Sequence, residues 1–272
     1  MRKRYAYGVI ALLAVGYFAF SYLFPSDNLS KEPFVPEKFQ LAGGPERENR
    51  GFPQREIVDL ASEYPDTFFR QGSIKEAKVA LSFDDGPDNN YTVKILDTLK
   101  KHKVPATFFV IGSRCELYPK VMKRMVKEGH RLGNHTWSHP NMVKMSNEAI
   151  LKELTKTDEI IKKYAGYTPV IFRSPYGSLK REQVEFLRDK GYKLISWNVD
   201  SLDWKGLSAA EIKTNVLENL EQGSIILQHS AGGPGEDLSG TVKALDEIIR
   251  VLKKDGYKFV TVDEILEIEY KR

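Results

Sequence analysis

From about residue 77 to the C-terminus, short apolar runs alternate with longer amphipathic segments. The runs have the length of β-strands and occupy residues 78–83, 106–111, 170–172, 193–197, 224–228 and 258–262. The amphipathic segments occupy residues 91–102, 119–128, 146–166, 180–190, 209–220 and 241–254. Apolar residues recur in them every three or four positions, which predicts helices with one buried face.

Repeated strand–helix units indicate a parallel sheet with right-handed crossovers. A further strand before residue 135 brings the expected number to about seven. No Gly-x-Gly-x-x-Gly pattern follows the first strand, so a dinucleotide-binding sheet is disfavoured. We therefore expect an α/β fold, a distorted (β/α) barrel of about seven parallel strands. Chemistry in such barrels lies at the C-terminal ends of the strands, so polar motifs should follow the strands directly.

The N-terminus has the pattern of a membrane anchor. Residues 7–24 carry no charged side chain and follow the basic cluster at residues 2–4. This length is at the short end of what spans a bilayer, and the basic cluster should stay cytoplasmic. A cleavable signal peptide is the competing interpretation, but no small-x-small cleavage pattern follows. We predict a cytoplasmic tip and transmembrane helix over residues 1–24, in a single-pass protein of the cell membrane whose remainder is extracellular.

Residues 25–75 differ in composition from the rest of the chain. Six prolines interrupt every candidate helix there, and apolar periodicity is poor. We predict an extracellular stalk, with one short helix near residues 55–62 packing on the domain that follows. That domain is expected to cover residues 76–272.

Charge and composition exclude some classes of function. The formal net charge is +4, and the basic residues at positions 2–4 account for most of it. No dense basic run occurs later, so nucleic acid is not an expected partner. Cys115 is the only cysteine and is interpreted as an incidental thiol. His102 and His130 fall near predicted helix ends, away from the polar motifs, where surface or capping roles are expected.

Two motifs together indicate a metal site. Asp84 and Asp85 close the first predicted strand, and adjacent carboxylates repel each other unless a cation lies beside them. The two carboxylates could have different roles, with one binding a metal and the other acting as a base. His135 and His139 lie four residues apart, and neutral imidazole is a good ligand for zinc and its neighbours. A site with two histidines and one aspartate leaves positions open for water and substrate, as in catalytic metal sites.

Three further motifs follow predicted strands. Arg173 could orient and keep ionised a nearby carboxylate, and the turn at Tyr176 could aim a backbone N–H at an oxyanion. Asp203 and Trp204 form the fourth motif, and His229 ends the fifth. An aspartate paired with this histidine would favour its protonated, acid form.

With these five motif regions, residues 78–265 resemble the polysaccharide deacetylase family, carbohydrate esterases with a nodulation-protein-like domain. The motifs occur in the family's order and at ordinary spacings. The resemblance implies that Asp84 is the general base, held by Arg173. It also implies that His229 is the general acid, with Asp203 tuning it.

The same resemblance implies the rest of the site. The metal ligands would be Asp85, His135 and His139. The backbone of Tyr176 would help to form the oxyanion hole. Trp204 and Leu227, with Tyr176, would form the pocket for the acetyl group. Zinc is the metal that these ligand types favour, with Co²⁺ or another transition metal left open.

The implied function is metal-dependent hydrolysis of N-acetyl groups on N-acetylglucosamine residues of peptidoglycan, with release of acetate. Tyr176 resembles the glucosamine-directed branch, since relatives acting on N-acetylmuramic acid tend to carry arginine there. Chitin oligomers or poly-N-acetylglucosamine are the second choice of substrate, and acetylated xylan is the third. A non-catalytic cell-wall-binding protein is the alternative from another class. A phosphoesterase lacks support, because the site has only one cationic residue. We expect a monomer whose partners are the wall polysaccharide and the membrane.

Overall fold

The structure is a computed structural model that describes residues 59–233 and 235–272. The predicted anchor at residues 1–24, and the predicted stalk as far as residue 58, lie outside the described residues and stay predictions. Within the described ranges, no helix is both long enough and apolar enough to cross a bilayer.

The described residues form a nine-stranded sheet in which all the paired strands run parallel. Its strands are β1 (Phe68–Phe69), β2 (Lys78–Asp84), β3 (Thr107–Val110), β4 (Arg131–Asn134), β5 (Ile171–Phe172), β6 (Lys193–Ile195), β7 (Val199–Asp200), β8 (Ser224–His229) and β9 (Lys258–Val260). Their order is β1-β6-β5-β4-β3-β2-β8-β7, and β9 pairs with the first half of β2. The α/β class and the parallel strands are confirmed. The two strands that sequence did not predict, β1 and β7, are only two residues long.

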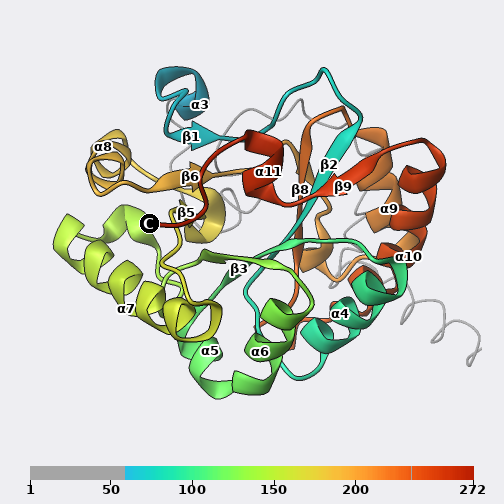
Figure 1. The fold of residues 1–272 in the computed structure, drawn as a ribbon, viewed down its shortest axis with the longest axis horizontal. Coiled ribbons are helices and arrows are strands. Elements are labelled where there is room, and N and C mark those ends of the chain that lie inside the picture. The colour runs from blue at the N-terminus through green and yellow to red at the C-terminus, as the bar shows by residue number, and fades with distance from the viewer. Residues whose placement is uncertain (1–58, 234) are drawn as a thin grey trace, which may run out of the picture. The chain divides into compact units, whose positions relative to one another are not determined.

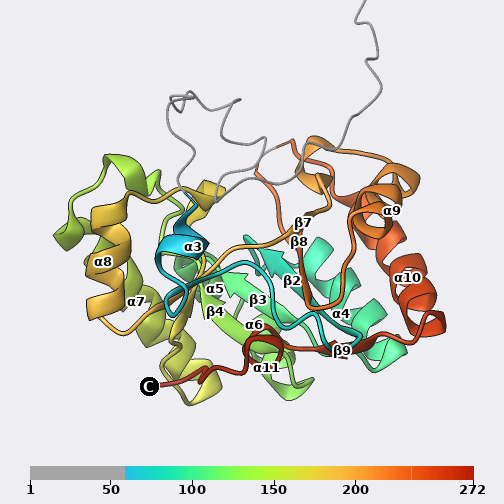
Figure 2. The same ribbon diagram turned by 90° about the horizontal axis from the view of Figure 1, so that it is seen from above.

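Helices lie around the outside of this sheet (Figure 1 and Figure 2). They are α3 (Leu60–Glu63), α4 (Tyr91–His102), α5 (Gly112–Leu117), α6 (Pro119–Lys127), α7 (Asn147–Ala165), α8 (Arg181–Asp189), α9 (Ala209–Glu218), α10 (Ser239–Lys254) and α11 (Val262–Leu266). Short 3₁₀ turns occur at η1 (Met142–Lys144), η2 (Pro175–Gly177) and η3 (Asp203–Lys205). The six helices predicted within residues 91–254 are all present, with ends that differ by at most two residues. The short helix predicted near residues 55–62 corresponds to α3, and residues 55–58 lie outside the described residues.

Local chemistry fixes where helix α7 starts and stops. The Ser146 side chain accepts a hydrogen bond from the N–H of Ala149, which satisfies one of the free donors of the first turn. Gly166 ends the helix with φ 78°, a left-handed conformation that glycine adopts without steric cost.

The core consists of three buried clusters, two of which lie on opposite faces of the central strands. In β2, Val79, Leu81 and Phe83 pack into the cluster under the outer helices, whereas Ala80 faces the cluster inside the curved sheet. The register of β2 with β8 pairs Asp84 with His229. The two strands therefore deliver these polar residues at the same level of the sheet.

The folded part of the chain begins before residue 76. Helix α3 and strand β1 lie in the stretch that sequence assigned to the stalk, and β1 pairs with β6. Leu60 and Phe68 are buried in one cluster with Leu194. Their burial explains why the chain from Leu60 onward packs on the domain.

Candidate active site

Polar side chains gather at the C-terminal ends of the strands, as the barrel hypothesis predicts. They surround a cavity of about 210 Å³. The residues singled out from sequence that line it are Asp84, Asp85, His135, His139, Tyr176, Trp204, Leu227 and His229. Arg173 and Asp203 are buried and contact the lining residues Asp84 and His229. All ten predicted residues thus belong to one site.

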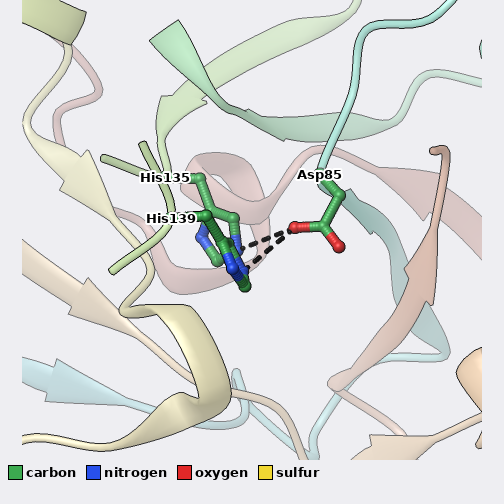
Figure 3. A group of neighbouring side chains, drawn as sticks. All are labelled: Asp85, His135 and His139. Carbon is green, nitrogen blue, oxygen red and sulfur yellow. Dashed lines mark ion pairs between the residues drawn. The ribbon is translucent and has the colours of Figure 1, made fainter. Parts of the chain in front are cut away.

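Asp85, His135 and His139 point toward one another (Figure 3). The Oδ1 atom of Asp85 lies 3.4 Å from Nε2 of His135 and 3.2 Å from Nε2 of His139. This oxygen is buried and has no hydrogen-bond partner in the described part of the chain. A buried carboxylate oxygen without a partner is costly unless a cation satisfies it. Two imidazole nitrogens and one carboxylate form a donor set that fits zinc or a related divalent metal.

The protonation states of two members of the triad, Asp85 and His139, suit metal binding. Burial raises the pKa of Asp85, but His139 and His135 outweigh this effect and hold it well below its usual range. Burial also lowers the pKa of His139 to about 4, against a smaller effect of Asp85. For His135, burial is outweighed by Asp84 and Asp85, which raise its pKa. Near pH 7, Asp85 is therefore anionic and His139 is neutral. These are the states in which the two side chains can bind a metal.

Each histidine of the triad is oriented through its other ring nitrogen. Nδ1 of His135 donates to the backbone oxygen of Arg173 at 2.7 Å. Nδ1 of His139 lies 3.2 Å from the phenol oxygen of Tyr176, whose ring also packs edge-on against the imidazole. Such contacts fix the tautomer and aim Nε2 of each ring at the metal position.

The loop that carries the two histidines is held by helix α7. The carboxylate of Glu153 accepts hydrogen bonds from the N–H groups of Trp137 and Ser138 at 2.9 and 2.8 Å. Asn134 donates to Asp158 at 2.7 Å, while its own side-chain oxygen accepts the N–H of Thr136. These bonds hold a strained backbone, since Thr136 has φ 68° and His139 has φ 57°.

Sequence reasoning missed Glu153 and Asp158. Asp158 lies on the buried side of α7 together with Ile150, Leu154 and Ile161. An aspartate in this apolar stripe was the available signal, because a buried carboxylate needs partners. The partners are Asn134, Tyr192 and Arg272.

Asp84 forms a buried ion pair with Arg173. The guanidinium lies 2.7 Å from Oδ1 of Asp84 and is only 1% exposed. Its remaining N–H groups donate to the backbone oxygens of Ile195 and Ser196 at 3.2 Å. The ion pair is therefore completed by hydrogen bonds, which a buried charge requires. Its effect is to fix the carboxylate of Asp84 at the edge of the cavity.

His229 is fixed by Asp203. Oδ1 of Asp203 lies 2.7 Å from Nδ1 of His229, and Oδ2 accepts the backbone N–H of the same residue at 2.8 Å. Thr241 donates to Oδ2 as well, at 2.9 Å. Because Nδ1 is bound to the aspartate, Nε2 is the ring nitrogen that can exchange a proton with a group in the cavity.

The other singled-out residues lie away from the site. His102 contacts Asp246 at 2.7 Å. The expected surface or capping role of His130 is wrong, because the residue is 6% exposed and neither ring nitrogen has a hydrogen-bond partner among the described residues. Cys115 is buried, and burial raises the pKa of its thiol, which keeps it protonated and unreactive.

Comparison with known proteins gives one consistent family. The family model for polysaccharide deacetylase matches residues 71–195. A peptidoglycan-N-acetylglucosamine deacetylase of Bacillus cereus is 37% identical over 270 residues, which cover 98% of this chain and 95% of that protein. A peptidoglycan-N-acetylmuramic acid deacetylase of Bacillus subtilis is 34% identical over 96% of this chain, which spans only 52% of that relative.

The fold also matches a solved structure. A crystal structure of a peptidoglycan N-acetylglucosamine deacetylase in complex with 4-naphthalen-1-yl-N-oxidanyl-benzamide aligns with a TM-score of 0.76. The two chains are 42% identical, and the alignment covers 79% of this chain and all of the other.

Proposed function

This chain belongs to the polysaccharide deacetylase family of hydrolases, and from that premise we propose that it removes N-acetyl groups from N-acetylglucosamine residues of peptidoglycan, releasing acetate. The observation that carries the proposal is that one triad and two pairs of side chains converge on one cavity. These are the donor set around Asp85, the ion pair of Asp84 and the hydrogen-bonded pair of His229.

The donor set would hold a divalent metal through Asp85, His135 and His139. When bound, such a metal supplies Lewis acidity to a carbonyl oxygen and to a water. Zinc is the ion that these ligands favour, and Co²⁺ or another transition metal is the alternative.

The residues of the chain divide the proton transfers between them. Asp84, held in place by Arg173, takes a proton from the water as that water attacks the acetyl carbon. The backbone N–H of Tyr176 donates to the developing oxyanion. His229 then gives a proton to the nitrogen of the departing sugar amine, and Asp203 stabilises the charged imidazole. The C–N bond breaks, and acetate and a free amine leave.

The cavity offers an apolar wall to the acetyl methyl group. Trp204 and Leu227 line it, and Trp197 adds a second indole that sequence reasoning did not single out. The choice of N-acetylglucosamine rests on Tyr176 and on the Bacillus cereus relative. The Bacillus subtilis relative is named for the muramic acid sugar, so both sugars belong in the test.

We test the activity by measuring acetate release from purified peptidoglycan and from chitin oligomers, with zinc and with a chelator. Asp84→Asn and His229→Ala should each lower the rate by about 100-fold or more without unfolding the chain. Asp255→Asn, at the end of α10, is the matched control and should keep the rate. Release of acetate from chitin oligomers alone would indicate that they, and not peptidoglycan, are the substrate. No release from either polymer by the folded, metal-loaded chain would overturn the proposal in favour of a non-catalytic wall-binding protein.

The location of the enzyme is part of the proposal. We propose a monomer anchored by residues 1–24, with the domain outside the membrane, on the basis of the uncharged segment and its basic flank. Sedimentation with membranes and digestion of intact cells by added protease test this arrangement. Recovery of a shortened chain in the medium would instead indicate a cleaved signal peptide.

A further inference from the structure

A groove of about 910 Å³ lies at the end of the sheet opposite the active site. Its walls come from α4 and α6, which lie side by side in both ribbon views (Figure 1 and Figure 2). Its floor includes Val104, Pro105 and His130, which immediately precede the starts of β3 and β4. The groove therefore opens at the N-terminal ends of the strands, whereas the catalytic residues follow their C-terminal ends.

The rim of the groove is strongly basic. Six cationic side chains line it, and Glu128 is the one carboxylate among the lining residues. Glu128 is engaged with Lys100 and Arg124. The other four cations, which have no carboxylate partner in the described part of the chain, are Lys103, Lys120, Lys123 and Lys127.

A favourable interaction with the helix dipoles explains the position of only some of these basic residues. Helices α4 and α6 both end at the groove, and basic residues are favourable in a last turn. Lys127 fits that explanation. Lys120 does not, because it lies in the first turn of α6, where the positive end of the dipole disfavours a cation. Lys123 lies in the following turn and gains nothing from the dipole either.

Buried polar atoms beside the lysines lack partners. Within residues 59–233 and 235–272, both ring nitrogens of His130 are buried without a hydrogen bond, and so is Oε2 of Glu128. Burial lowers the pKa of His130 to about 4, so near pH 7 the ring is neutral and offers one N–H donor and one acceptor. Leaving such a group unsatisfied is unfavourable for the folded chain. A ligand that satisfies these atoms and the lysines must combine negative charge with hydrogen-bond donors, which hydroxyl groups supply.

We propose that this groove binds a phosphate ester of a polyol. The phosphate pairs with Lys120, Lys123 and Lys127, since lysine binds phosphate as a point charge. A hydroxyl of the polyol donates to Oε2 of Glu128, and the imidazole of His130 completes the contacts. This site goes beyond the proposed hydrolysis and does not depend on it.

Calorimetry with the purified full-length chain tests the proposal, with glycerol 3-phosphate as the probe in phosphate-free buffer of fixed ionic strength. We expect saturable binding at one site per chain. The triple variant Lys120→Gln, Lys123→Gln, Lys127→Gln should weaken it by about tenfold or more, equivalent to about 1.4 kcal/mol. Three exposed lysines of α7 provide the matched control. Substituted together, Lys152→Gln, Lys162→Gln and Lys163→Gln make the same change of charge elsewhere and should leave the affinity within about twofold.

Two further measurements separate this site from simpler explanations. The urea unfolding midpoint of the groove variant should match that of the unaltered chain, which shows that the variant is folded. Inorganic phosphate should bind more weakly than glycerol 3-phosphate, by about tenfold, because it lacks the polyol hydroxyls. Binding of inorganic phosphate or sulfate as tightly as glycerol 3-phosphate would overturn the proposal, as would no binding of glycerol 3-phosphate. Binding only to vesicles that contain phosphatidylglycerol would also overturn it and would indicate a membrane-facing surface instead.

Discussion

The buried His130 should make folding stability fall in mild acid. Its pKa is about 4 in the folded chain against 6.5 for an exposed histidine, and burial is the main cause. As the pH falls below about 6.5, the unfolded chain takes up a proton that the folded chain does not. Stability is therefore complete above this value and decreases as the pH falls toward 4.

The size of the effect follows from the two pKa values. The full difference corresponds to about 3 kcal/mol, reached below pH 4, and at about pH 5 the loss is about 2 kcal/mol. Little solvent screening applies, because the side chain is 6% exposed. Glu128 raises the pKa of His130 and Arg124 lowers it, so these neighbours oppose each other.

The variant His130→Leu isolates this contribution. Urea unfolding of both chains is measured in phosphate-free buffer at about pH 8 and about pH 5. Titrating groups away from His130, including the histidines of the candidate metal site, affect both chains equally and cancel in the difference. The unaltered chain should lose about 2 kcal/mol more than the variant between the two conditions.

Two results would refute this reasoning. A difference below about 0.5 kcal/mol between the chains would show that the imidazole is not kept neutral by burial. Near pH 8 the leucine should cost little, because it replaces a ring whose nitrogens have no partner. A loss of about 3 kcal/mol there would show that those nitrogens are hydrogen-bonded.

Three changes at the active site have separable outcomes. Tyr176→Phe removes the phenol oxygen beside His139 but keeps the backbone N–H, so metal affinity should fall about tenfold while kcat at saturating zinc is largely kept; a collapse of kcat alone would contradict this role. Glu153→Leu removes the acceptor of two loop N–H groups and should lower zinc affinity by about 10–100-fold, read by competition with a chromophoric chelator. Unchanged zinc affinity would show that the histidine loop keeps its conformation without Glu153. Arg173→Met leaves Asp84 as a buried charge without its partner and should cost about 3–5 kcal/mol in urea unfolding. Adding Asp84→Asn to that variant should restore most of the loss, and its failure to do so would point to packing instead.

The sequence was sufficient for features that depend on neighbouring residues. Apolar runs long enough to be buried identified the central strands, and the 3.6-residue periodicity with Ser146 and Gly166 identified α7 almost to the residue. The candidate metal ligands could be found because the strands are parallel. Their C-terminal ends share one edge, so Asp85 and His135 had to approach each other.

The tertiary structure alone decided the features that depend on packing between distant segments. Strands β1 and β7 are too short to leave a pattern, and they exist because β6 and β8 offer free edges to pair with. No feature of the neighbouring sequence indicates the role of Glu153. It accepts hydrogen bonds from the histidine loop because α7 packs beside that loop. His130 was expected near the surface, but in the folded chain it is 6% exposed and its ring lies edge-on to Phe108 of β3. A sequence specifies which side chains can be buried or bonded, whereas the three-dimensional arrangement of the elements determines which partners they meet.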